Sequence, residues 1–363
     1  MSRKYIDAVT YDITMNCNLR CKHCYNANYL EAGKGVRIDV EKTINALSKI
    51  DFGSIVIQGG EPLLVENLEE LVNKLSRKGV NVQITTNATL LTKDRVVGLI
   101  KAGLRGIFFS VESASGLVND ELRGKGTYEL FYRNVKNFMN IYTVLLERKL
   151  VPPMRIAFSC TVSSINFKTD DDIRSMFELA KEMKISDIVF NSLQNFGASK
   201  NLEYNKDTTN LKLANSIVEV SKKFPQISMQ LPLKMIEHEF LKKRNGYDIN
   251  IKGAKGKCPA GEHVAYIDPE LNIFPCAWLI HLNSEHPFTI ENKVCLYDEV
   301  PENMFETFIQ HRDRCVAIFK DCTKCKYVDN CIPVCPCVEK FSVENGEERK
   351  NMSCPTKTEM RGF

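Results

Sequence analysis

The sequence predicts an α/β fold in which six strand-then-helix units form a partial, TIM-like (β/α)6 barrel, followed by a small cysteine-rich α+β domain. Apolar, β-branched runs alternate with amphipathic stretches over the first 195 residues, a pattern typical of a parallel sheet wrapped by helices. Ten of the 14 cysteines lie between Cys258 and Cys354, where this alternation stops. Six units amount to three-quarters of a full eight-unit barrel.

The expected elements follow from the period of the apolar residues. Strands are expected at Ala8–Met15, Ser54–Gln58, Val80–Thr85, Arg105–Val111, Arg155–Val162 and Asp187–Leu193. Helices are expected at Val40–Ile50, Leu68–Arg77, Lys93–Ala102, Tyr128–Arg148 and Asp171–Met183, each with apolar residues near a 3.6-residue period.

Beyond the alternating region the chain changes character. One more helix (Leu211–Phe224) and a short strand (Ile227–Leu231) precede a Gly- and Lys-rich linker at 245–257. A hairpin follows over 263–276, with Asp-Pro-Glu-Leu-Asn as its turn. We therefore expect the barrel at 1–205, a connecting segment at 206–257 and the cysteine-rich domain at 258–363.

Composition excludes several classes of protein. With 44% hydrophobic and 26% charged residues, the 363-residue chain is globular, and a net charge of +4 is too balanced to indicate binding to nucleic acid or an anionic membrane. The first residues lack the apolar run of a signal peptide, and no stretch is long enough to span a membrane. We expect a cytoplasmic protein whose thiols stay reduced, so clustered cysteines indicate metal binding.

The first cysteine cluster, Cys17, Cys21 and Cys24, forms a CxxxCxxC motif directly after the first expected strand. Three thiolates on one loop leave one iron of a 4Fe–4S cluster open, whereas pure electron transfer usually uses four. The alternative is a zinc site that lacks one ligand, with His23 nearby, although this spacing is uncommon among zinc fingers.

This motif, followed one strand–helix unit later by Gly59-Gly60-Glu61-Pro62, resembles the radical S-adenosylmethionine (radical SAM) superfamily. The resemblance implies that Gly59, Gly60 and Glu61 contact the methionine amino group of S-adenosylmethionine (SAM) through carbonyl and carboxylate groups. The residue types suit that task, because glycine permits close approach of the backbone and a carboxylate pairs with an ammonium.

Three further segments resemble the same superfamily more weakly. Thr86-Asn87 ends the third strand, Ser110 ends the fourth, and Arg123 opens an RGKGT segment. The resemblance implies that Ser110 and an arginine hold the methionine carboxylate, and both Arg123 and Arg133 are candidates. All these positions fall at carboxyl ends of expected parallel strands, where α/β barrels place their active sites.

The cysteines of the tail resemble those of a SPASM domain, a seven-cysteine appendage of radical SAM enzymes that modify peptides and proteins. The resemblance implies two auxiliary 4Fe–4S clusters, and therefore three clusters in all. It assigns Cys322, Cys325, Cys331 and Cys354 to the distal cluster, and Cys258, Cys276 and Cys335 to the nearer one. Zinc ribbons are the alternative, because CxxC pairs also bind zinc.

Departures from the SPASM pattern leave two points open. Relatives usually have glycine five residues before the second cysteine, where this chain has Leu271, so the hairpin geometry is expected to differ slightly. The nearer cluster also lacks a fourth cysteine. The candidates for that position are Cys337, Cys295, Cys315 and His263, or the iron is open to substrate.

The sequence thus predicts an enzyme in which a 5′-deoxyadenosyl radical abstracts hydrogen from a peptide or protein. Crosslinking, backbone excision or epimerisation in the maturation of ribosomal natural products is the first choice. Only 16 residues precede Cys17, so we expect either a separate leader-peptide recognition protein or a substrate that the barrel itself binds. An electron donor such as flavodoxin or ferredoxin is also expected. No catalytic acid or base is assigned.

Three alternatives remain open at this point. Sulfatase-maturing relatives carry Asp directly after the second SPASM cysteine, where this chain has Ala277. Radical dehydrogenases of small molecules usually have a shorter tail. A zinc-stapled binding protein would explain the tail cysteines but not CxxxCxxC together with Gly-Gly-Glu-Pro.

Overall fold

The computed structural model describes residues 5–193, 197–202, 210–231, 259–277, 279 and 293–316. Its strands are β1 (Tyr5–Thr14), β2 (Asp51–Gly59), β3 (Asn81–Thr86), β4 (Gly106–Ser110), β5 (Arg155–Val162), β6 (Asp187–Ser192), β7 (Ser228–Gln230), β8 (Val264–Ile267), β9 (Asn272–Phe274) and β10 (Val294–Cys295). Its α-helices are α1 (Val40–Leu47), α2 (Leu68–Arg77), α3 (Lys93–Ala102), α4 (Gly116–Arg123), α5 (Thr127–Glu147), α6 (Asp170–Glu182), α7 (Asn210–Ser221) and α10 (Met304–Val316). Two 3-10 turns are η1 (Pro62–Leu64) and η2 (Gly197–Asn201).

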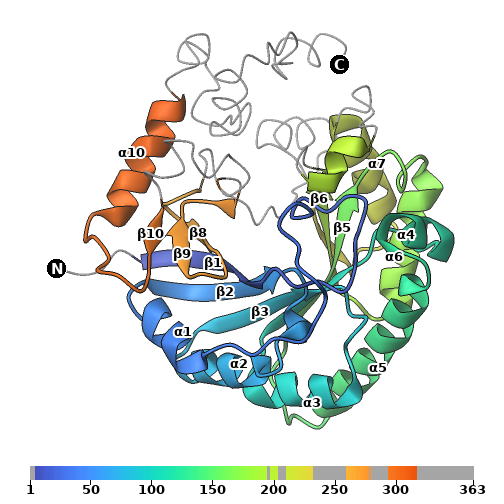
Figure 1. The fold of residues 1–363 in the computed structure, drawn as a ribbon. Helices are drawn as coiled ribbons and strands as arrows, with labels where there is room; N and C mark the ends of the chain where they lie inside the picture. Colours follow the sequence, from blue (N-terminus) through green and yellow to red (C-terminus); the bar gives the residue numbers. More distant parts are fainter. Residues whose placement is uncertain are drawn as a thin grey trace.

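All ten strands belong to one sheet, in the order β10-β9-β8-β1-β2-β3-β4-β5-β6-β7. Strands β1 to β7 pair in parallel with their neighbours, and β8 is also parallel to β1. Strand β9 pairs antiparallel with both β8 and β10. Figure 1 shows the sheet curved, with α1, α2, α3 and α5 along its outer side. This arrangement confirms the predicted partial barrel and its six strand–helix units.

The parallel strands form because their side chains are buried on both faces, one against the helices and one inside the barrel. In β1 the last four residues, Tyr11 to Thr14, are all buried. Helix α5 packs through its aromatic residues: the rings of Phe138 and Phe109 on β4 lie 5.3 Å apart in an edge-to-face arrangement. No described helix is both long and apolar enough to cross a membrane.

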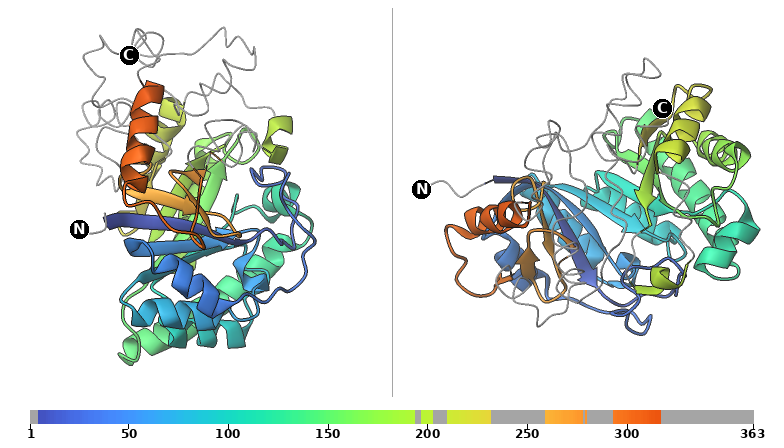
Figure 2. Two further views of the ribbon diagram at one scale, coloured as in Figure 1. Left: turned by 60° about the vertical axis from the view of Figure 1, so that its left-hand side comes forward. Right: turned by 90° about the horizontal axis from the view of Figure 1, so that it is seen from above.

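Three features of the fold go beyond the sequence prediction: one helix and two strand pairings. Helix α4 forms over GLVNDELR, which holds too few apolar residues to give a helical period. The expected short strand becomes β7 and adds a seventh parallel strand beside β6. The predicted hairpin is present as β8 and β9, but it also extends the main sheet by pairing with β1. Figure 2 shows α10 beside this end of the sheet.

The turn of this hairpin keeps a backbone conformation that favours glycine. Leu271 has a φ of 62°, in the left-handed region. Asp268 holds the turn, because its carboxylate accepts hydrogen bonds from the backbone and the side chain of Asn272, at 2.8 and 2.7 Å. The leucine therefore occupies the conformation that glycine would adopt more easily, and the hairpin still forms.

A buried carboxylate joins this hairpin to the barrel. Asp12 on β1 is fully buried and accepts hydrogen bonds from the Tyr266 hydroxyl on β8 (2.8 Å), the Gln58 amide on β2 (3.1 Å) and the Asn26 amide after the first cysteine motif (3.2 Å). Burial raises the pKa of Asp12 to about 6, although the hydrogen bonds from Tyr266, Gln58 and Asn26 lower it. Asp12 thus connects three segments that are distant in sequence.

The raised pKa predicts how Asp12 affects stability. A carboxyl whose pKa is higher in the folded state stabilises the fold most at low pH, and that stability is lost as the pH rises through about 6. Between about pH 5.5 and about pH 7.5 the loss is roughly 1 kcal/mol. Asn at position 12 does not titrate. The gap in unfolding temperature, wild type minus Asp12→Asn, should therefore be larger at the lower pH than at the higher one. Asp51→Asn, at an exposed site on β2, is the matched control. A pH-independent gap for Asp12→Asn would contradict the prediction.

Candidate active site

The first cysteine cluster lies on the loop that follows β1, at the carboxyl end of the sheet. Cys17 is buried, and Cys21 and Cys24 are partly exposed. The Arg20 guanidinium fixes the loop by donating to the Cys17 carbonyl at 2.7 Å and to the Glu31 carbonyl at 2.6 Å. Sequence reasoning missed Arg20, which gave no signal beyond its place inside the motif.

All three thiols line one cavity of about 560 Å³, a size within the usual range for small-molecule sites. Its walls include residues from the ends of the parallel strands: Thr86, Ser110, Ser159, Thr161, Asn191 and Gln230. Gly59, Gly60, Glu61 and Arg123 also line it. The structure therefore brings the predicted cysteines and the predicted SAM-contacting residues of the barrel to one cavity, as expected for a barrel of this type.

Burial favours the protonated form of the three thiols. Burial raises the pKa of Cys17 to about 12 and that of Cys24 to about 11, and it also raises the pKa of Cys21. A metal must therefore displace these protons on binding. Among the described residues, no group of three or more His, Cys, Asp or Glu side chains is arranged around a single-ion site. Three thiols on one wall of a larger cavity fit an iron–sulfur cluster with one open iron.

Gly59 and Gly60 allow the end of β2 to touch the end of β1. A Cβ on Gly60 would lie 2.1 Å from the Asn16 carbonyl oxygen, and one on Gly59 would lie 2.4 Å from the Thr14 carbonyl oxygen. The Gly60 amide donates to Thr14 at 2.7 Å, and the Glu61 amide donates to Asn16 at 2.8 Å. The glycines are thus needed for contact between two backbone segments, before any contact with a ligand is considered.

The Glu61 carboxylate is buried and makes three hydrogen bonds within the protein. It accepts from the Thr86 hydroxyl (2.6 Å), the Asn87 amide (2.8 Å) and the Leu63 amide (3.0 Å). Burial raises the pKa of Glu61, and these hydrogen bonds offset part of that effect. Contact of this carboxylate with a methionine ammonium stays a prediction.

The end of β3 also holds the cysteine loop in place. The Asn87 side-chain amide donates to Asn18 Oδ1 at 3.0 Å, and the Asn18 amide donates to the Thr89 hydroxyl at 2.8 Å. The sequence resemblance singled out Asn87 but not Asn18, which lies between Cys17 and Cys21. Its polar side chain within the motif was the signal that could have found it.

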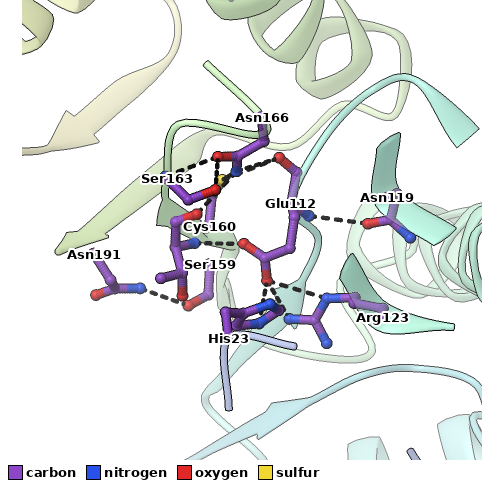
Figure 3. Close-up of polar contacts among 10 residues, drawn as sticks. His23, Glu112, Asn119, Arg123, Ser159, Cys160, Ser163, Asn166 and Asn191 are labelled. Atoms are coloured by element: carbon purple, nitrogen blue, oxygen red, sulfur yellow. Dashed lines mark hydrogen bonds and ion pairs between the residues drawn. The ribbon is translucent and has the colours of Figure 1, made fainter. Parts of the chain in front are cut away.

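Figure 3 shows Glu112, just after β4, at the centre of a buried polar cluster. One oxygen, Oε1, lies 2.5 Å from Arg123 Nη2 and 3.1 Å from His23 Nε2, and the other accepts from the Thr161 amide at 2.6 Å. Burial alone would raise the pKa of Glu112, but the charges of His23 and Arg123 and the hydrogen bonds lower it to about 2. Glu112 is therefore ionised at neutral pH. Glu112 lies two residues after Ser110, and the sequence analysis predicted no role for it.

The structure distinguishes the two candidate arginines. Arg123 lines the cavity with Ser110, whereas Arg133 is absent from the lining formed by the described residues. Arg133 instead donates to its neighbour Asn134 at 3.4 Å. Of the two, only Arg123 is placed to contact a ligand in this cavity.

Most of the tail cysteines lie outside the described residues. Cys258, Cys322, Cys325, Cys331, Cys335 and Cys354 belong to this group, as does Cys337. Cys276 is described and partly exposed, and the next residue, Ala277, lines the cavity. His263 is exposed, with Nδ1 2.9 Å from the Asp7 carboxylate. The auxiliary ligand sets stay predictions.

Comparison with known proteins identifies the domain. Residues 11–147 match the family model described as the Radical SAM superfamily. This part of the chain is therefore a radical SAM domain, and the protein is an enzyme. The superfamily implies a 4Fe–4S cluster and SAM as cofactors.

Individual proteins resemble the chain at lower identity. The AdoMet-dependent heme synthase of Methanosarcina barkeri is 26% identical over 285 residues, which cover 75% of this chain and 76% of that protein. The PqqA peptide cyclase of Rhodopseudomonas palustris is 29% identical over 120 residues, or 32% of each chain. Several other curated relatives are matched over only 33% to 52% of their length. Streptococcus suis SuiB bound to the precursor peptide SuiA has the same fold, with a TM-score of 0.69, 16% identity and coverage of 93% of this chain and 73% of that chain.

The contacts of Glu61 lead to a test of its role. Replacing Glu61 with Ala leaves the Asn87 and Leu63 amides without their acceptor, and we expect it to lower the free energy of unfolding by about 3 kcal/mol. If the carboxylate also binds SAM, the Kd for SAM should rise while the iron content stays intact. The matched control is Glu66→Ala, an exposed glutamate on the same segment. Calorimetric unfolding and SAM titration check both expectations, and an unchanged Kd would reduce Glu61 to a structural residue.

Proposed function

We propose that the protein is a radical SAM enzyme that modifies a peptide or protein substrate, in the maturation of a ribosomal natural product. The observation that carries this proposal is the character of the cavity. Its described lining is rich in neutral groups that donate and accept hydrogen bonds: Thr10, Gln58, Thr85, Ser159, Asn191 and Gln230. Such groups suit the amide groups of a peptide backbone, which are neutral donors and acceptors.

The same lining argues against a tetrapyrrole, the substrate type suggested by the heme synthase relative. Tetrapyrroles of the haem type carry several carboxylates, which need cations in a buried site. Arg123 is the one Lys or Arg in the described lining, and Glu112 already pairs with it. Similarity to PqqA peptide cyclase and to the peptide-binding SuiB supports the peptide alternative.

The cofactors fit the residues of the barrel. Cys17, Cys21 and Cys24 would hold a 4Fe–4S cluster, which together with SAM would supply the radical chemistry that removes a hydrogen from the substrate. The chain's own residues hold and orient the ligands. Gly59, Gly60, Glu61, Ser110 and Arg123 all line the cavity, so they are placed to contact a ligand there.

The second half of the proposal is a SPASM domain at 258–363, after the barrel at 1–205 and a connecting segment at 206–257. It would add two auxiliary clusters, held by seven of the ten cysteines from Cys258 to Cys354. Ala277 lines the cavity without a carboxylate, which disfavours a base at the position used by sulfatase-maturing relatives. Crosslinking, excision or epimerisation then remain, with a leader-peptide recognition protein and a flavodoxin or ferredoxin as partners.

Iron content tests the cluster assignment. Three 4Fe–4S clusters require roughly twelve irons per chain in protein reconstituted without oxygen. Replacing Cys17, Cys21 and Cys24 together with Ala should lower this to roughly eight and abolish 5′-deoxyadenosine formation. Cys160→Ala, at a buried cysteine outside the loop, should keep all the iron. A triple variant that still forms 5′-deoxyadenosine would refute the assignment.

The substrate class is tested by mass spectrometry. A short peptide encoded beside the gene is incubated with the reduced enzyme and SAM without oxygen, and a change in the mass of the peptide is expected that depends on SAM. The triple cysteine variant is the control and should leave the peptide unchanged. Conversion of a tetrapyrrole carboxylate, with no change in any such peptide, would instead favour the chemistry of the heme synthase relative.

A further inference from the structure

Glu112 lies at the back of the cavity and reaches it only through its partners. The residue is fully buried and is not part of the cavity lining, whereas Arg123 and His23 both are. Its backbone is also held, because the Glu112 amide donates to Asn119 at 3.0 Å and its carbonyl accepts from Asn166 at 2.7 Å. The carboxylate is therefore fixed in position and cannot contact a ligand directly.

The pairing with Arg123 uses one edge of the guanidinium. Nε and Nη2 lie 3.1 and 2.5 Å from the same carboxylate oxygen of Glu112, and Figure 3 shows this edge turned toward it. Within the described part of the chain, Nη1 has no hydrogen bond to the protein. A planar guanidinium held along one edge presents its remaining nitrogen in a fixed direction.

We propose that Glu112 is a positioning residue for SAM, holding Arg123 edge-on so that Nη1 is presented to the methionine carboxylate. This proposal rests on the proposed function. Charge supports it, because a buried guanidinium without a partner is costly, and Glu112 both neutralises and orients it. The second contact, to His23, fixes the cysteine loop at the same carboxylate, so one side chain aligns two walls of the site.

The conservative variant Glu112→Gln distinguishes two roles of Glu112: orienting Arg123, or repelling the methionine carboxylate of SAM by its charge. Glutamine keeps the shape but replaces one oxygen by an NH₂ group, which faces donors on every side: Arg123, His23 and the Thr161 amide. Arg123 then loses its fixed edge, and we expect the Kd for SAM to rise about tenfold. If Glu112 mainly repelled the methionine carboxylate, its removal would instead tighten SAM binding.

Calorimetric titration of the unreduced holoenzyme with two ligands, SAM and decarboxylated SAM, makes the test specific. The second ligand lacks the carboxylate, so its Kd should be the same in the wild-type protein and in Glu112→Gln. Arg123→Gln should also weaken SAM binding, and the double variant should bind SAM no more weakly than Arg123→Gln alone. Glu129→Gln, at an exposed glutamate on α5, is the matched control and should bind both ligands normally.

Each result has a defined meaning. Equal weakening of both ligands, or additive effects in the double variant, would show a merely structural role and overturn the proposal, as would tighter SAM binding. If Glu112→Gln loses iron, Glu112→Asp takes its place. The ratio of the two Kd values is then compared, because it does not depend on the fraction of active protein, and an unchanged ratio overturns the proposal. A wild-type holoenzyme that binds no SAM would refute the proposed function itself.

Discussion

The backbone contact between the ends of β1 and β2 is the constraint on which the site depends. Here the amides of Gly60 and Glu61 donate to the carbonyl groups of Thr14 and Asn16, at 2.7 and 2.8 Å. Two adjacent glycines make this approach possible, because a side chain at Gly60 would overlap the Asn16 backbone. The contact fixes where the cysteine loop starts relative to the next strand, so the thiols and the Gly-Gly-Glu segment face one cavity.

The pKa values of two buried glutamates within this frame are shifted in opposite directions. Glu61 is surrounded by neutral donors, and burial raises its pKa, whereas Glu112 touches His23 and Arg123 and has a lowered pKa. Their burial is alike, so the difference comes from the partners, and the partners come from different segments. The fold thus keeps a firmly ionised carboxylate next to the guanidinium that lines the cavity.

Much of this arrangement followed from the sequence, because local patterns determine it. Strands buried on both faces gave long apolar runs, and the motifs stood at their carboxyl ends, so the meeting of Cys17, Gly60 and Ser110 in one cavity was predicted. Tertiary contacts were not predictable in this way. Helix α4 has a weak apolar period, and the pairing of Glu112 with His23 depends on how the cysteine loop folds over β4. The SPASM assignment depends on spacing alone.

The pairing of β8 with β1 has a consequence for how separable the two halves of the chain are. Residues Ala8 to Tyr11 bond to β8 on one side, so β1 is an interior strand of the sheet. A chain ending before β8 would leave that row of backbone donors and acceptors unpaired, and an unpaired strand edge promotes aggregation. It would also remove the Tyr266 hydroxyl from buried Asp12. The barrel and the first part of the tail are therefore joined through the sheet, and a cut between them would expose the edge of β1 and take a hydrogen bond from Asp12.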